Sequence, residues 1–116
     1  MDDATRARLH DIIETSATVN RLRPRNRLGF ESDLDVQRAM ARLVEIIGEA
    51  ASHVSDEVQN LHPELPWREM IGMRNRLNTD RLETDPELLW LFVSVEIPRL
   101  APQVAAVLHE LPEQVG

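Results

Sequence analysis

The chain has 116 residues, enough for one domain spanning residues 1–116 with a modest hydrophobic core. It contains no cysteine, so disulfides, thiolate metal sites and cysteine nucleophiles are excluded. The formal net charge of −7 argues against a DNA-coating surface, and two Trp and two Phe are too few for the stacking platforms of sheet-type RNA-binding modules. The sequence shows neither a signal peptide nor 18 uninterrupted apolar residues, so a soluble cytoplasmic protein without a membrane partner is expected.

Residues 3 to about 20 are predicted to form an amphipathic helix with one buried stripe. Apolar or small residues recur at helical spacing along one side: Leu9, Ile12, Ile13, Ser16 and Val19. Asp2 and Asp3 favour the start of this helix through their interaction with the helix dipole.

Residues 21–31 are predicted to form a loop, because they contain Pro24 and Gly29 and show no helical period. The segment holds four arginines: Arg21, Arg23, Arg25 and Arg27. On an acidic protein these arginines could form an arm that contacts phosphates, or they could belong to a solvated and mobile loop. The second interpretation is the simpler one.

A long helix is predicted over residues 34–54, with Asp33 as its N-cap. Its apolar arc is too broad for one neighbour, which places the helix at the centre of a bundle or also at a dimer interface. Glu45 and Glu49 lie four residues apart beside this arc. We interpret them as solvent-facing side chains rather than as acid–base or metal-binding carboxylates.

Residues 55–63 are predicted to form a short helical turn that ends at a proline. His53 and His62 lie near this corner without the acidic or cysteine neighbours of a metal site, and we interpret them as surface or capping residues. A helix should follow over residues 67–77, since Pro66 suits a first helical turn.

The last helix is predicted to begin at Thr84-Asp85-Pro86-Glu87, which combines a polar cap with a proline in the first turn. It should run to about residue 109, with a kink near residues 94–97 because Pro98 lacks a backbone donor. No segment alternates with period two. The sequence therefore predicts an all-α, up-and-down four-helix bundle with a kinked last helix, and the broad apolar arc of residues 34–54 makes it plausibly dimeric.

Arg74 falls on the apolar side of its predicted helix, on the same third of the circumference as Met70 and Ile71. An arginine is rarely buried without a partner. Arg74 is therefore expected either to pair with Glu45 or Glu49, or to be exposed in a shared groove.

Four segments carry a resemblance to a known family: EIIGEAA (residues 45–51), HPELPWREMIGMRNRL (62–77), DPELLW (85–90) and Ile97-Pro98-Arg99-Leu100. Over nearly the whole chain they resemble the HepT-like (DUF86) branch of the HEPN superfamily. The resemblance implies a HEPN-like four-helix-bundle homodimer whose two sites face each other across a cleft. It also implies a metal-independent ribonuclease toxin without cofactors, paired with a minimal nucleotidyltransferase (MNT) antitoxin.

The family signature is an arginine, a polar residue, a few spacers and a histidine, commonly followed two residues later by a tyrosine. Arg74 and Asn75 match the first two positions, and the resemblance makes them catalytic residues together with Thr79, which stands at the histidine position. Arg81 stands at the tyrosine position, so the hydroxyl to which the partner enzyme attaches nucleotides is absent. Arg74, Arg76 and Arg81 are expected to form a phosphate-binding patch for RNA.

Threonine cannot replace histidine in proton transfer, since a histidine titrates at about pH 6.5 and a hydroxyl does not. Loss of one positioned acid–base group slows a reaction by about 10²- to 10⁴-fold. Asp80 is the neighbouring candidate base, but an exposed aspartate with a pKa of about 3.9 is a weak one. Three hypotheses follow: an impaired ribonuclease toxin, an inactive homodimeric subunit that docks on the nucleotidyltransferase or holds RNA, and a structural role in which Arg74 only pairs with Glu45 or Glu49.

Overall fold

The computed structural model describes the backbone of residues 2–77 and 85–110 and the side chains of residues 2–73 and 85–109. Its helices are, in chain order, α1 (Asp3–Leu22), α2 (Arg27–Glu31), α3 (Leu34–Ser52), α4 (Asp56–Leu61), α5 (Trp67–Leu77), α6 (Pro86–Leu91), the π-helical segment η1 (Phe92–Glu96) and α7 (Ile97–Glu110). The described residues contain no strand, so the all-α prediction is confirmed.

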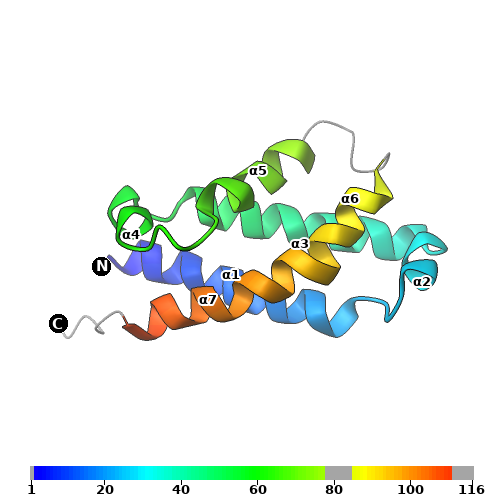
Figure 1. Ribbon diagram of the computed structural model, residues 1–116, viewed down its shortest axis with the longest axis horizontal. Helices are drawn as coiled ribbons and strands as arrows, with labels where there is room; N and C mark the ends of the chain where they lie inside the picture. Colours follow the sequence, from blue (N-terminus) through cyan, green and yellow to red (C-terminus); the bar gives the residue numbers. More distant parts are fainter. Residues whose placement is uncertain (1, 78–84, 111–116) are drawn as a thin grey trace.

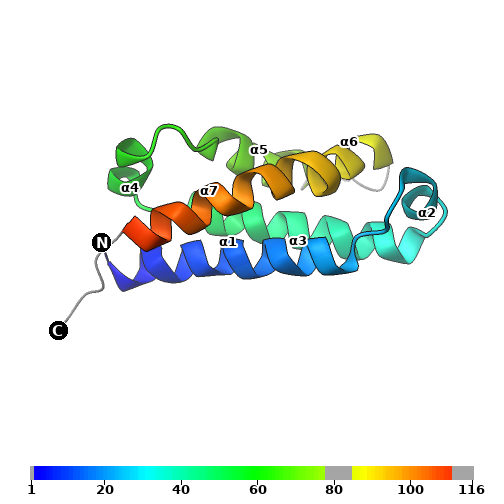
Figure 2. The same cartoon turned by 60° about the horizontal axis from the view of Figure 1, so that its bottom comes forward.

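The long helices form an up-and-down bundle of four rods: α1, α3, α5 and the continuous run of α6, η1 and α7. Helix α3 packs against both α1 and α5, and α7 closes the bundle by packing on α1. The molecule measures 49 × 26 × 23 Å, and α1, α3 and α7 extend along its long axis (Figures 1 and 2). Helix α3 is therefore central, as its broad apolar arc predicted.

The predicted helix starts are confirmed by side chains that accept hydrogen bonds from free backbone amides. The Asp2 carboxylate accepts from the Thr5 amide at 2.7 Å, and the Asp33 carboxylate accepts from two amides in the first turn of α3. The Ser55 hydroxyl caps α4 and the Asp85 carboxylate caps α6. Each cap satisfies donors that no helical carbonyl can reach.

The prediction of a loop over residues 21–31 holds only for residues 23–26. Helix α1 continues to Leu22, and Arg27–Glu31 forms the short helix α2. The Asn26 side chain caps α2 by accepting from the Gly29 amide at 2.8 Å. Phe30 is fully buried, and the Gln37 side chain donates to its carbonyl oxygen at 2.9 Å. A local cap and burial of one large side chain thus overcome the helix-breaking composition that favoured a loop.

The last helix is interrupted at η1, close to the kink predicted from Pro98. A proline supplies no amide, so carbonyl groups in the preceding turn lose their helical donors. Two side chains donate in this region: the Ser94 hydroxyl to the Trp90 carbonyl oxygen at 2.5 Å, and the Arg23 guanidinium to the Val93 carbonyl oxygen at 2.6 Å. The π-helical turn absorbs the mismatch without ending the helix.

Candidate functional site

The helix α5 carries the first half of the sequence signature and is held by its own buried side. Trp67, Met70 and Met73 are buried, and α5 packs against α3. The indole N–H of Trp67 donates to the His62 carbonyl oxygen at 2.8 Å, which ties the first turn of α5 to the end of α4. These contacts fix the rotation of α5 about its axis, and with it the position of Arg74.

The structure places the backbone of Arg74, Asn75 and Arg76 in the last turns of α5. Their side chains, and the whole of Thr79 and Arg81, lie outside the described part of the chain. Arg74 follows the buried Met70 by four residues, so its backbone position falls on the same side of α5 as Met70. The helices α5 and α6 flank the segment that holds the other signature positions.

The carboxylates proposed as partners of Arg74 have partners elsewhere. Glu45 accepts from Arg42 at 3.2 Å, and Glu49 pairs with the imidazole of His53 at 2.9 Å. Both glutamates line a hollow of about 350 Å³ between α1 and α3, together with Arg8 and other residues of that face. Glu49 also has a further interaction, and the side chain of Arg74 lies outside the described residues, so the expected pairing with Arg74 stays a prediction.

A groove between α5 and the last helix is a feature that the sequence did not reveal. It has a volume of about 450 Å³. Its apolar floor and charged rim come from two elements: Arg68, Glu69, Gly72 and Met73 of α5, and Leu88, Leu91, Phe92 and Glu96 of α6 and η1. A Cβ atom added to Gly72 would have no neighbour within 4 Å, so the groove reaches the bare backbone of α5. Gly72 is the one sequence feature that could have indicated this groove. A glycine within a helix does not by itself show whether another element packs beside it or leaves a groove.

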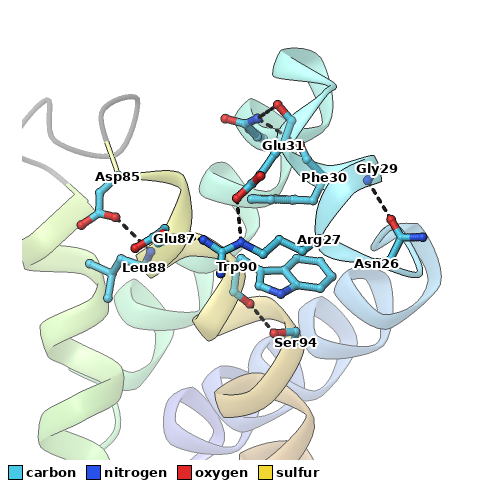
Figure 3. Close-up of polar contacts among 11 residues, drawn as sticks. Asn26, Arg27, Gly29, Phe30, Glu31, Asp85, Glu87, Leu88, Trp90 and Ser94 are labelled. Carbon is cyan, nitrogen blue, oxygen red and sulfur yellow. Dashed lines mark hydrogen bonds and ion pairs between the residues drawn. The ribbon is translucent and has the colours of Figure 1, made fainter.

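The start of α6 is fastened to α2 (Figure 3). The Arg27 guanidinium bridges two carboxylates, Glu31 at 2.7 Å and Glu87 at 2.5 Å. These hydrogen bonds, that of Glu31 first, raise the pKa of Arg27. Beside them the rings of Phe30 and Trp90 lie 5.2 Å apart at 40°. Helix α2 therefore positions the helix that follows the signature segment.

The arginine-rich segment divides into structural and free side chains. Arg23 donates to the Asn20 side chain at 3.0 Å as well as to the Val93 carbonyl, and Arg27 holds its two glutamates. Arg21 and Arg25 are exposed and form no side-chain hydrogen bond or ion pair with the described residues. An arm of four phosphate-binding arginines is thus reduced to two candidates.

The histidines near α4 have the capping positions that we predicted. His53 is the C-cap residue that follows α3, and His62 is the C-cap residue that follows α4. The His62 imidazole contacts the Glu64 carboxylate at 3.0 Å. The pKa of Glu64 lies below its usual value, chiefly because the backbone amide of Glu64 itself donates to the carboxylate and secondarily because of His62. In the described residues no three potential metal ligands gather.

The helical architecture and the placement of Arg74 and Asn75 at the end of α5 define an all-α bundle of the HEPN-like class. A family model described as "Ribonuclease HepT-like" matches residues 7–107. The chain therefore belongs to the HepT-like ribonuclease family.

Named relatives agree with this family. A "Probable ribonuclease HepT" of Thermococcus cleftensis is 42% identical over 71 residues, which are 61% of this chain and 64% of the relative. A "Putative RNase MJ1380" of Methanocaldococcus jannaschii is 31% identical over 111 residues, covering 88% of this chain and 94% of that protein. A "Putative RNase TTE0752" of Caldanaerobacter subterraneus is 31% identical over 101 residues, covering 87% and 90%. No solved structure shows a significant match to the chain.

Proposed function

We propose that residues 1–116 form one HepT-like domain that acts on RNA as the toxin component of a HEPN/MNT toxin–antitoxin pair. The observation that carries this proposal is the family match over residues 7–107, with Arg74 and Asn75 retained at the end of α5. The active form is a homodimer in the cytoplasm, partnered by a nucleotidyltransferase antitoxin. The reaction class is metal-independent cleavage of the RNA backbone.

Such cleavage needs a base that takes the 2′-hydroxyl proton, an acid that protonates the leaving oxygen, and a cation that stabilises the charged phosphate. Arg74 supplies the cation, because a guanidinium offers a fixed fork of donors to phosphate oxygens. Thr79 stands where the family has histidine and does not titrate near neutral pH. We therefore expect RNA binding to be retained and cleavage to be about 10²- to 10⁴-fold slower than with histidine.

The same substitution favours a second candidate function, a subunit that binds without cutting. Arg74, Arg76 and Arg81 would then form a patch that holds phosphates, present twice in the homodimer. Arg81 also lacks the hydroxyl that an antitoxin of this kind modifies. The nucleotidyltransferase would then dock on the protein without modifying it covalently. Incubation with this partner and ATP should leave the intact mass unchanged; a gain of one AMP would contradict this part of the proposal.

A cleavage assay with single-stranded RNA in EDTA tests the proposal. Purified wild-type protein is compared with Thr79→His, Arg74→Ala and the control Arg42→Ala, which removes the same charge from an exposed site on α3. We expect Thr79→His to raise the cleavage rate at least 100-fold and Arg74→Ala to weaken RNA binding, with Arg42→Ala close to wild type. Equally strong cleavage by the wild type and Thr79→His would refute the impairment. Absence of RNA binding in every variant would refute both the ribonuclease and the RNA-holding subunit, and would leave only docking on the nucleotidyltransferase.

A further inference from the structure

The connection from α1 to α3, residues 20–32, is a basic segment on an acidic protein, and we call it the arginine corner. It carries four arginines, Arg21, Arg23, Arg25 and Arg27, and one acidic residue, Glu31. Its formal charge is therefore +3, so the rest of the chain carries −10 of the net −7. A polyanion is attracted to such a corner and repelled by most of the remaining surface.

The backbone of the arginine corner is held in place by contacts on both sides. The Arg23 guanidinium donates to the Asn20 side chain at 3.0 Å and to the Val93 carbonyl oxygen at 2.6 Å. Asn26 caps α2, whose Phe30 is fully buried. Side chains that project from a fixed backbone bind a ligand with little loss of main-chain entropy.

Arg21 and Arg25 are the two arginines of the corner that these contacts leave free. Both are exposed, and neither has a hydrogen bond or ion pair with the described residues. Arg21 lies in the last turn of α1, where a cation stabilises the helix dipole. Arg25 directly precedes Asn26, the N-cap of α2, where a cation opposes the dipole. The stability of the helices therefore does not explain Arg25.

The carboxylates nearest the corner are engaged elsewhere. Glu31 and Glu87 both accept hydrogen bonds from Arg27 (Figure 3). The Asp33 carboxylate accepts from the amides of Asp35 and Val36 at 3.1 and 3.2 Å. None of these acidic groups pairs with Arg21 or Arg25. Two guanidinium groups without a carboxylate partner are suited to an anion that another molecule supplies.

The arginine corner lies beside the helix that follows the signature segment. The contact between Arg27 and Glu87 joins α2 to the first turn of α6, and α6 begins directly after residues 78–84. In Figures 1 and 2 the end of α1, α2 and the start of α6 lie at the same end of the bundle, opposite α4. A polyanion that is bound at the end of α5 and runs past the start of α6 therefore reaches the corner.

We propose that Arg21 and Arg25 bind backbone phosphates of single-stranded RNA, as a second contact outside the signature segment. This inference rests on the action on RNA in the proposed function and extends the path of the RNA to the arginine corner. Contacts of this kind position the strand and add affinity without reading its sequence. The exposed Leu22 and Leu28 would also suit a protein partner. RNA is favoured because a strand held at α5 is present at the corner at a high effective concentration.

Fluorescence anisotropy with a labelled 2′-O-methyl oligouridylate of about 20 nucleotides tests the contact, because the blocked 2′ oxygen prevents cleavage. The double variant Arg21→Gln/Arg25→Gln should bind at least about 10-fold more weakly at low salt. Its plot of log affinity against log salt should be shallower by about 1.4, since each phosphate contact on a single strand contributes about 0.7.

The matched control is Arg8→Gln/Arg42→Gln, which removes the same charge from the hollow between α1 and α3 and should change the affinity less than about twofold. Arg21→Lys/Arg25→Lys should restore most of the salt dependence, because lysine keeps the charge. Circular dichroism confirms that all variants keep the wild-type helix content.

Cross-linking gives a measurement that leaves both arginines in place. The chain has no cysteine, so Leu28→Cys and Leu61→Cys each introduce one thiol. Leu28 is 77% exposed on α2, and Leu61 is 63% exposed on α4 at the opposite end of the bundle. With benzophenone maleimide attached, Leu28→Cys should cross-link to the oligouridylate on irradiation, and Leu61→Cys should not.

Four outcomes would overturn the proposal: wild-type affinity in Arg21→Gln/Arg25→Gln, an equal loss in the Arg8 and Arg42 control, cross-linking through Leu61→Cys as strong as through Leu28→Cys, or weaker binding of the nucleotidyltransferase with unchanged RNA affinity. The last result would assign the corner to a protein partner.

Failure of this inference is distinguishable from failure of the proposed function. Cleavage by Thr79→His with wild-type RNA affinity in Arg21→Gln/Arg25→Gln would refute the corner contact alone. RNA binding that depends on Arg21 and Arg25 but not on Arg74, with no cleavage in any variant, would refute the proposed function and leave the corner contact standing.

Discussion

Replacing Phe30 with alanine should destabilise the protein by about 3 kcal/mol, although Phe30 lies in a segment that resembles a loop. The side chain is fully buried, and its ring lies 5.2 Å from that of Trp90. Truncation of a buried phenylalanine costs roughly 3–5 kcal/mol through lost transfer energy and the cavity that remains. We take the lower end because a five-residue helix at the margin of the bundle can relax around the cavity.

Urea unfolding at one fixed protein concentration, followed by circular dichroism at 222 nm, measures this loss. With an m-value of about 2 kcal/mol/M, the midpoint should fall by roughly 1.5 M. Leu28→Ala is the matched control, since Leu28 lies on the same helix and is 77% exposed; it should change the free energy of unfolding by less than about 0.5 kcal/mol. If Phe30→Ala costs no more than Leu28→Ala, α2 is not docked and the assignment of this segment as a loop was right.

Three smaller predictions concern α1 and the contacts of its ends. Ser16→Ala should stabilise the protein by about 0.5–1.5 kcal/mol in the same unfolding assay, because the buried hydroxyl of Ser16 has no hydrogen-bond partner in the described residues; a loss of stability would reveal a partner. Arg23→Met should destabilise the protein by about 1–3 kcal/mol, because the Val93 carbonyl loses its charged donor. The control Arg21→Met changes an exposed neighbouring site and should be nearly neutral. Equal losses of stability in the two variants would refute a role for this hydrogen bond. Hydrogen bonds from the backbone and side chain of Thr5, in the first turn of α1, lower the pKa of Asp2. The ionised Asp2 therefore stabilises the folded protein fully above the unfolded-state pKa of about 3.8. This stabilisation is lost as the pH falls through the lower folded-state pKa. The stability difference between wild type and Asp2→Ala should therefore be constant near pH 7 and vanish in acid; a difference that persists in acid would rule out the carboxylate as its source.

Local chemistry was sufficient to place the main helices. Asp33, Ser55 and Asp85 were recognisable as caps because a capping side chain acts on amides two or three residues away. Pro98 similarly predicted the interruption of the last helix, because a missing backbone donor affects carbonyl groups within one turn. These signals act within a few residues, so a sequence contains all that is needed to read them.

Helix α2 was missed because its stabilising contacts are distant in the chain. Phe30 packs against Trp90, and Arg27 bridges to Glu87 across 60 residues. The residues near Phe30 in the sequence do not show that its side chain is buried against a distant helix. The same limit applies to Arg23, whose partner Val93 lies 70 residues away.

The sequence by itself determined the family, the retained Arg74–Asn75 pair and the replacement of the histidine by Thr79, because each is a matter of residue identity and spacing along one chain. The tertiary structure alone decided which apolar surface remains uncovered. The pattern gave α3 the broadest apolar side, and α1 and α5 pack against most of it. The last helix, in contrast, keeps Leu91 and Val95 exposed. A helix shows in its sequence how wide its apolar side is; only packing determines how much of that side its neighbours cover.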